Sequence, residues 1–190
     1  MDATDTLKHE HRIVLLVLDA VEREAQALRW LGRRQASPSR RQASRRVRRE
    51  RIEQMLDFSR SFIDRCHHAK EEKHLFPLLQ RRGVTGPVSV LLAEHEQGRA
   101  IVKVAAELLP RATDDPTSAA ALAENLQAYA RLLREHIEKE DGVLFPMGEK
   151  LLTSGERQEL VEAFERIERE EMGEGVHEKY HRLAHELAES

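Results

Sequence analysis

Two stretches of the chain share a residue spacing that suits metal binding. Residues 67–77 read HHAKEEKHLFP and residues 136–146 read HIEKEDGVLFP, so each begins with a histidine, has a glutamate at its fifth position and ends in Leu-Phe-Pro. The matching positions are His67 with His136, and Glu71 with Glu140. Residues four apart lie on one face of an α-helix, with Cβ atoms about 5 to 6 Å apart. Each stretch can therefore direct one imidazole and one carboxylate at a single point.

Two more histidines, His11 and His95, each follow a glutamate and lie in the apolar stripe of a long helical pattern. Together with the two repeated stretches, every long stripe carries a histidine. Burial of four imidazoles and two carboxylates requires compensation, because an unpaired ionised carboxylate in an apolar interior is strongly unfavourable. A bound cation would provide it. The candidate metal ligands are His11, His67, Glu71, His95, His136 and Glu140.

The elements that carry these residues are predicted to be helices. Aromatic residues are only 4% of the chain, and the apolar runs are short and interrupted by charge, which favours an all-α fold. Capping residues, glycines and prolines divide the chain into four long helices and two shorter ones. The long helices are expected from Thr4 or Asp5 to Gly32, from about Arg45 to Pro77, from Pro87 to Pro110, and from Pro116 to about Gly148. The short helices begin near Thr153, where Thr153 and Glu156 have capping-box spacing, and near Val176.

Length and composition exclude several kinds of protein. A chain of 190 residues can bury a core without disulfides or a structural metal, and its net charge of −3 implies no particular partner. The longest purely apolar run, Ile13 to Leu18, is too short to cross a membrane, and the first residues lack the order of a signal peptide. The single cysteine, Cys66, excludes an intrachain disulfide and suits a reducing compartment. We therefore expect a cytoplasmic protein with no membrane partner.

The order of the motifs resembles a known family. A single histidine, an HxxxE, a second single histidine and a second HxxxE, with KEE and LFP beside the first HxxxE, are similar to the bacterial HHE cation-binding branch of the hemerythrin family. This resemblance implies an antiparallel up-down four-helix bundle at residues 1–150 with two non-heme irons, followed by a helical extension at residues 151–190 that packs on the bundle. The implied ligand roles are one iron on His11 and His67, the other on His95 and His136, and Glu71 and Glu140 as bridges beside an oxo or hydroxo group.

One position departs from the oxygen carriers of that family, which have a fifth histidine where this chain has Arg99. One iron would then lack a ligand and leave room for a small molecule. We expect a di-iron protein that binds or reacts with oxygen, peroxide or nitric oxide, in sensing, iron handling or the response to oxidative or nitrosative stress. Whether it is an enzyme, and whether iron is preferred over zinc or manganese, stays open, as do the physiological ligand and the oligomeric state.

Two other functions fit parts of the same pattern. An oxygen-carrying or storage hemerythrin needs the same bundle. A ferritin-like protein needs Glu-x-x-His on two core helices, and Glu71 with His74 forms one such pair. No such pair exists in the fourth helix, which disfavours the ferritin-like alternative.

The remaining polar residues have simpler interpretations. His9, His68 and His74 lie off the apolar stripes and are predicted to be solvated. Glu72 is interpreted as a surface charge, Cys66 as a small buried hydrophobic residue, and Tyr129 as core. A second metal on the last helix stays an open alternative, and its ligands would be His177, His181 and His185.

Residues 33–51 contain nine arginines, opposed only by Glu50. Such a run could bind nucleic acid, but no interleaved aromatic residue, helix-turn-helix or zinc-finger pattern accompanies it. We therefore predict a solvated loop or internal ion pairs in this segment and no nucleic-acid partner.

Overall fold

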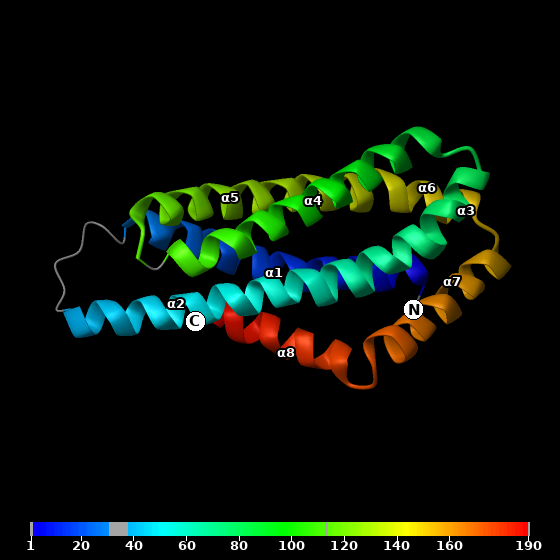
Figure 1. The fold of residues 1–190 in the computed structure, drawn as a ribbon. Coiled ribbons are helices and arrows are strands. Elements are labelled where there is room, and N and C mark those ends of the chain that lie inside the picture. Colours follow the sequence, from blue (N-terminus) through cyan, green and yellow to red (C-terminus); the bar gives the residue numbers. More distant parts are fainter. Residues whose placement is uncertain (1, 31–37, 113, 190) are drawn as a thin grey trace.

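The computed structural model describes residues 2–30, 38–112 and 114–189. Within these residues the chain forms six helical segments and no strand, which confirms the all-α prediction (Figure 1). The segments are α1 (Ala3–Trp30); α2 (Pro38–Phe58) with η1 (Ser59–His68), η2 (Glu71–Leu75) and α3 (Phe76–Arg81); α4 (Thr85–Ala112); α5 (Pro116–Lys139) with η3 (Glu140–Leu144) and α6 (Phe145–Leu151); α7 (Ser154–Arg166) with η4 (Ile167–Met172); and α8 (Val176–Glu189).

The first four segments form an antiparallel bundle (Figure 1). Helix α1 packs against α5 and α2, while α4 packs against α5 and against α2 with η1. Two apolar clusters fill the bundle. One contains Leu18, Phe58 and Leu126, and the other, toward the end where α3 and α6 lie, contains Phe76 and Phe145. On each helix the buried histidines, and on the second and fourth segments Glu71 and Glu140, lie where the part that builds one cluster gives way to the part that builds the other. The clusters therefore enclose a polar layer in the middle of the bundle.

Wide π-helical turns interrupt the second and fourth segments beside this layer. Elements η1, η2 and η3 contain or border the two repeated motifs, and Pro77 and Pro146 follow η2 and η3 within two residues. The prediction that the helices end near these prolines is wrong, because the segments continue to Arg81 and Leu151. In a regular α-helix a proline clashes with the carbonyl four residues earlier. A preceding π turn changes that spacing, so the proline begins a new α-helical stretch instead of stopping the helix.

The start of the second segment also differs from the prediction. Helix α2 begins at Pro38 instead of near Arg45, consistent with the preference for proline in a first helical turn. The rest of the predicted loop, residues 32–37, lies outside the described residues. At the other end of this segment, Gly83 has φ of +88°, a conformation that disfavours other residues and closes the turn before α4.

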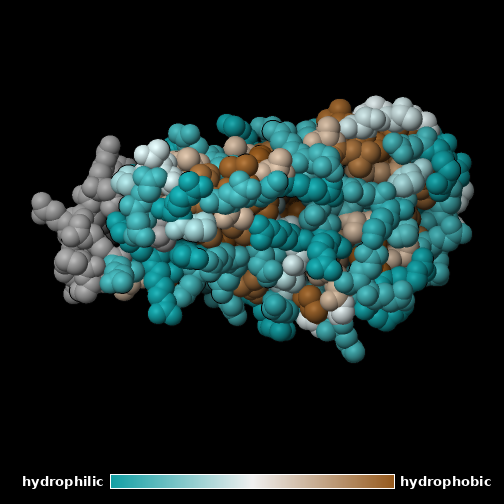
Figure 2. Space-filling view, in the orientation of Figure 1, coloured by the Kyte–Doolittle hydropathy of each residue, from teal (hydrophilic) through white to brown (hydrophobic). Residues whose placement is uncertain are grey.

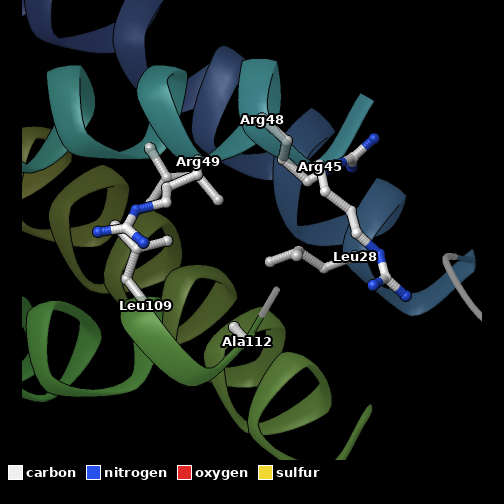
Figure 3. A pocket seen from close by; sticks show the side chains of 7 residues that line it. Leu28, Arg45, Arg48, Arg49, Leu109 and Ala112 are labelled. Atoms are coloured by element: carbon white, nitrogen blue, oxygen red, sulfur yellow. The ribbon is translucent and has the colours of Figure 1, made fainter. Parts of the chain in front are cut away.

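The arginine-rich part of α2 makes internal ion pairs. Arg48 and Arg51 lie 3.3 and 3.2 Å from the carboxylate of Glu24 in α1, and Arg45 lies 3.3 Å from Asp114. Figure 3 shows Arg45 and Arg48 beside the apolar side chain of Leu28, where their aliphatic stems cover part of the bundle's end. The described part of the segment is therefore helical and internally paired.

The last two segments lie along the bundle. Thr153 and Glu156 form the predicted capping box at the start of α7. Helix α8 packs along α1 and η4 packs against η1; the hydroxyl of Tyr180 donates to Asp57 at 2.9 Å. Figure 2 shows that the visible face is mostly hydrophilic, with scattered hydrophobic patches. Among the described residues, no helix is both long enough and apolar enough to cross a membrane.

Candidate metal centre

The six predicted ligands meet in the polar layer of the bundle. They come from α1, η1, η2, α4, α5 and η3, and none of the six residues is more than 2% exposed. The Nε2 atoms of His11 and His67 lie 2.9 Å apart, and those of His95 and His136 lie 3.1 Å apart. The four imidazoles thus form two facing pairs.

On the side away from its facing ring, each of the four imidazoles makes a hydrogen bond from Nδ1 to a carboxylate. The Nδ1–carboxylate distances are 2.8 Å for His11 with Asp141, 2.8 Å for His67 with Glu10, 2.7 Å for His95 with Glu72, and 3.0 Å for His136 with Glu94. An ionised carboxylate only accepts hydrogen bonds, so each Nδ1 must donate. In the neutral rings the lone pair is then on Nε2 and points at the facing ring. This carboxylate–histidine arrangement is the usual one around metal-bound histidines, and two facing lone pairs need a proton or a metal ion between them.

Glu71 and Glu140 lie between the two ring pairs. Glu71 Oε1 is 3.5 Å from His67 Nε2, and its Oε2 is 3.4 Å from His95 Nε2. Glu140 Oε2 is 3.3 Å from His11 Nε2 and 3.2 Å from His136 Nε2. All four oxygens of these two buried carboxylates lack a hydrogen-bond partner. Each glutamate therefore faces both pairs, as a bridging ligand would.

The pKa values of the two glutamates diverge in the metal-free protein. Burial raises the pKa of Glu71 well above its ordinary value, and the adjacent Glu140 raises it further. Burial also opposes ionisation of Glu140, but His136 and His11 outweigh it and hold the pKa of Glu140 well below its ordinary value. Burial and Glu140 thus favour the protonated form of Glu71 when no cation is present. Two bound cations would allow both to ionise.

The sequence duplication extends to the groups behind the rings. The carboxylate of Glu10, which accepts from His67, also forms an ion pair with Lys70. In the same way, the carboxylate of Glu94, which accepts from His136, forms an ion pair with Lys139. The two lysines directly precede Glu71 and Glu140 in the sequence. The halves differ in burial, because Lys70 is fully buried whereas the side chain of Lys139 is 40% exposed.

The C-terminal segments cause this difference. Glu168 of η4 lies 2.5 Å from Lys70, and Nε2 of His177 in α8 lies 3.1 Å from Glu10. Burial opposes ionisation of Glu10, but Lys70, His177 and His67 hold its pKa well below the ordinary value. The C-terminal extension therefore buries Glu10 and Lys70 beside His67, whereas Glu94 and Lys139 beside His136 stay partly exposed.

His68 was predicted to be solvated, and this prediction is wrong. Its side chain is buried, and its ring stacks on His95 with centroids 3.7 Å apart. The π-helical turn of η1 has more residues per turn than an α-helix, so the residue after His67 also turns inward. A stripe drawn with α-helical spacing could not place it.

Glu72 was also misjudged in part. Glu72 is not a free surface charge, since its Oε1 accepts from both His95 Nδ1 and Arg99 Nη2, at 2.7 and 2.6 Å. Arg99 also donates to Asp64 at 2.8 Å. Arg99 therefore holds the carboxylate that orients His95 and does not itself point at the centre.

The donor set suits two cations. Within the described residues, two groups of four buried side chains could each hold an ion, with one donor atom of each residue within 4.8 Å of the others. The groups share Glu71 and consist of His11, His67, Glu71 and Glu140, and of His68, Glu71, His95 and His136. The residues present thus fit a pair of metals that share a carboxylate. Their role as ligands stays a prediction.

Other polar residues are poor candidates for metal ligands. Glu10, Cys66 and His177 come close together, but the ammonium of Lys70 already bonds Glu10. Burial raises the pKa of the Cys66 thiol to about 12, which keeps it neutral. His177 and His181 lie with ring centroids 4.5 Å apart, while His185 on the same helix is exposed.

Three further predictions concern residues around the centre. Tyr129 is buried in the core, as predicted. His74 and His9 are half-buried, and neither belongs to a possible metal group in the described part of the chain.

Known proteins resemble this chain over part of its length. Rv1995, an uncharacterized protein of Mycobacterium tuberculosis (strain ATCC 25618 / H37Rv), is 33% identical over 117 residues, which are 60% of this chain and 46% of that protein. The iron-sulfur cluster repair protein YtfE of Salmonella newport (strain SL254) is 35% identical over 86 residues, which are 42% of this chain and 39% of that protein. The matched regions thus cover less than half the length of these curated relatives.

A broader match covers the whole bundle. Residues 2–148 match the hemerythrin HHE cation binding domain. This range includes the two facing pairs of histidines and both of the glutamates that lie between them. The match covers well over half of the chain and agrees with the resemblance seen in the order of the motifs. The chain therefore belongs to the hemerythrin HHE cation-binding domain family.

Proposed function

We propose that this protein holds two irons at a carboxylate-bridged centre and uses them to bind or react with oxygen, peroxide or nitric oxide. The observation that carries the proposal is the position of Glu71. Its two oxygens face different histidine pairs, at 3.5 and 3.4 Å, and neither oxygen has a hydrogen-bond donor. A buried carboxylate in this position is best explained by two cations that share it.

The donor types support iron. Each side of the centre offers two imidazoles and carboxylate oxygen, a set that suits non-heme iron with open coordination positions. When bound, iron supplies an open position and one-electron chemistry for small molecules. The chain itself contributes orientation and exclusion of water. Four carboxylates fix the rings, and the two apolar clusters close the bundle on both sides of the centre.

We further propose a role in iron handling or in the response to oxidative or nitrosative stress. The similarity to an iron-sulfur cluster repair protein supports this role over oxygen carriage, although it covers 42% of the chain. The ferritin-like alternative is not favoured, because His74 is half-buried and belongs to neither group at the centre.

The remaining proposals concern domains, location and partners. Residues 1–150 are the metal-binding unit and residues 151–190 an extension that covers one side of it. A single buried free thiol supports a cytoplasmic location. The internal ion pairs of Arg45, Arg48 and Arg51 support the absence of a nucleic-acid partner.

A reaction test follows from this proposal. The protein is loaded with iron, reduced without air, and mixed with peroxide, nitric oxide or oxygen while its optical spectrum is followed. We expect rapid spectral changes with peroxide or nitric oxide in the parent protein and none in Glu71→Ala. A reversible oxygen adduct as the only response would favour a carrier, and no response to any of the three would refute the proposal.

A further inference from the structure

A cavity of about 210 Å³ lies between the second segment and α4, directly beside the centre. Its lining includes Ile63 and Asp64 of η1, Gly98 of α4 and Tyr129 of α5, with His68 as the residue it shares with the centre. Arg60 and Lys103 also line it, and neither has an ion-pair partner among the described residues. The cavity is therefore open, large enough for a small molecule and positively charged along its lining.

His68 differs from the other four histidines at the centre. The Nδ1 atoms of the other four lie 2.7 to 3.0 Å from a carboxylate, to which they donate, whereas His68 Nδ1 is 3.6 Å from Asp64 and has no hydrogen-bond partner. It is also absent from the duplication, because the residue after His136 is Ile137. Only one half of the centre thus has an additional imidazole, and that imidazole is the least constrained of the five.

The stack of His68 on His95 does not direct both rings at one ion. The two rings are nearly parallel, with an interplanar angle of 14°, so lone pairs in their planes run side by side and do not converge on one ion. One ring must tilt if both are to bind the same metal. His95 is held by Glu72 at 2.7 Å, and His68 has no such bond. Of the two rings, His68 is therefore the one that can tilt at the lower cost.

We propose that this cavity is the access route for a small anion or diatomic molecule to the metal held by His95 and His136, and that His68 is a displaceable fifth imidazole ligand of that metal. This inference rests on the proposed function, because it requires that the centre holds two metals. The step is a ligand substitution. With a metal bound there, the neutral imidazole of His68 would give up its place to the incoming molecule, and no electron or proton would be transferred. The metal on His11 and His67 has no such ligand.

The first test examines whether the two metals differ. The protein and its variants are loaded with ⁵⁷Fe, the iron content is measured, and Mössbauer spectra of the diferric form are recorded. We expect two quadrupole doublets of equal area in the parent, because one iron has three imidazoles and the other two. His68→Ala should bring them close to a single doublet. His74→Ala, a histidine of the same segment outside the centre, is the matched control and should keep two.

The second test examines the route. Azide, a small anion, is mixed with the diferric protein and its binding rate is followed optically. We expect azide to bind His68→Ala about tenfold faster, the change for a barrier lower by about 1.4 kcal/mol. Gly98→Leu should bind azide about tenfold more slowly. A Cβ at Gly98 would meet Tyr129 only at an ordinary 3.8 Å, so the larger side chain fills the cavity. Gly86→Leu, on an open part of the same helix, should have no effect.

The outcomes separate this inference from the proposed function. A parent protein with fewer than two irons would overturn both. Two irons with a Mössbauer spectrum and azide rates unchanged in His68→Ala would overturn the role of His68 and leave the di-iron centre intact. Unchanged azide rates in Gly98→Leu would overturn the route. If His68→Ala does not load iron, His68→Gln keeps a polar side chain of similar reach, and the same spectral change is expected.

Discussion

The buried Lys70 provides a prediction with a control inside the same molecule. Its ammonium bonds Glu10 and lies 2.5 Å from Glu168, and both Lys70 and Glu10 are fully buried. Lys70→Met keeps the length and apolar packing of the side chain but leaves the carboxylate of Glu10 without its main cation. Removal of one partner of a buried ion pair costs about 3 to 5 kcal/mol. We expect the free energy of unfolding to fall by this amount.

Lys139 occupies the duplicate position and is the matched control. It bonds Glu94, but its side chain is 40% exposed and that of Glu94 is 16% exposed. Solvent screens such a pair, and exposed ion pairs typically contribute about 0 to 1 kcal/mol. Lys139→Met should therefore change the free energy of unfolding by about 1 kcal/mol or less.

Urea denaturation of both variants measures this difference, with the metal removed so that ligand binding does not mask it. The effect of Lys70→Met should be smaller at pH 5 than at pH 8, because Glu10 without Lys70 can take up a proton. Equal losses of stability in the two variants would refute the argument. They would show that the cover provided by η4 and α8 does not bury the charges behind His67 in solution.

Three further predictions test the centre and the extension. Glu71→Ala should lose both metals and His74→Ala neither, as measured by metal analysis; retained iron in the first would mean that the bridge is elsewhere. In the metal-free protein burial disfavours the charged form of His11, but Asp141 and Glu140 outweigh it and raise its pKa to about 9. Protonated His11 therefore stabilises the metal-free fold fully below pH 6.5, and this stabilisation is lost as the pH rises through 9. Asp141→Asn should lower that midpoint in an NMR titration, and an unchanged midpoint contradicts the assigned contact. Thr153→Ala should cost about 1 kcal/mol in urea denaturation, because the capping box at α7 is lost; no loss would mean that this cap is not formed.

The helices were predictable because their apolar stripes and caps are clear in the sequence, but the prolines were misleading. Pro77 and Pro146 were interpreted as helix ends, whereas each follows a π turn inside a continuing helix. A signal for these turns was present. Ile63, His67 and Glu71 follow one another in steps of four, and repeated steps of four stay on one face only if the helix is wider than an α-helix on average.

The facing histidines were visible in the spacing, but the groups that orient them were only partly visible. The duplication contains their signal, since an acidic residue follows each bridging glutamate and a lysine precedes it. Glu72 was nevertheless interpreted as solvated, because its sequence neighbours do not reveal that His95 approaches from another helix. His68 had no such signal, since its counterpart Ile137 is apolar. Its position depends on the π turn and on the packing of η1 against α4.

Crystals of the iron-loaded protein, measured with X-rays just above and below the iron absorption edge, test the central claim most directly. We predict two anomalous peaks per chain, one beside His11 and His67 and the other beside His95 and His136, with Glu71 between them. A single peak, or iron peaks away from these histidines, would contradict the account of a carboxylate-bridged pair.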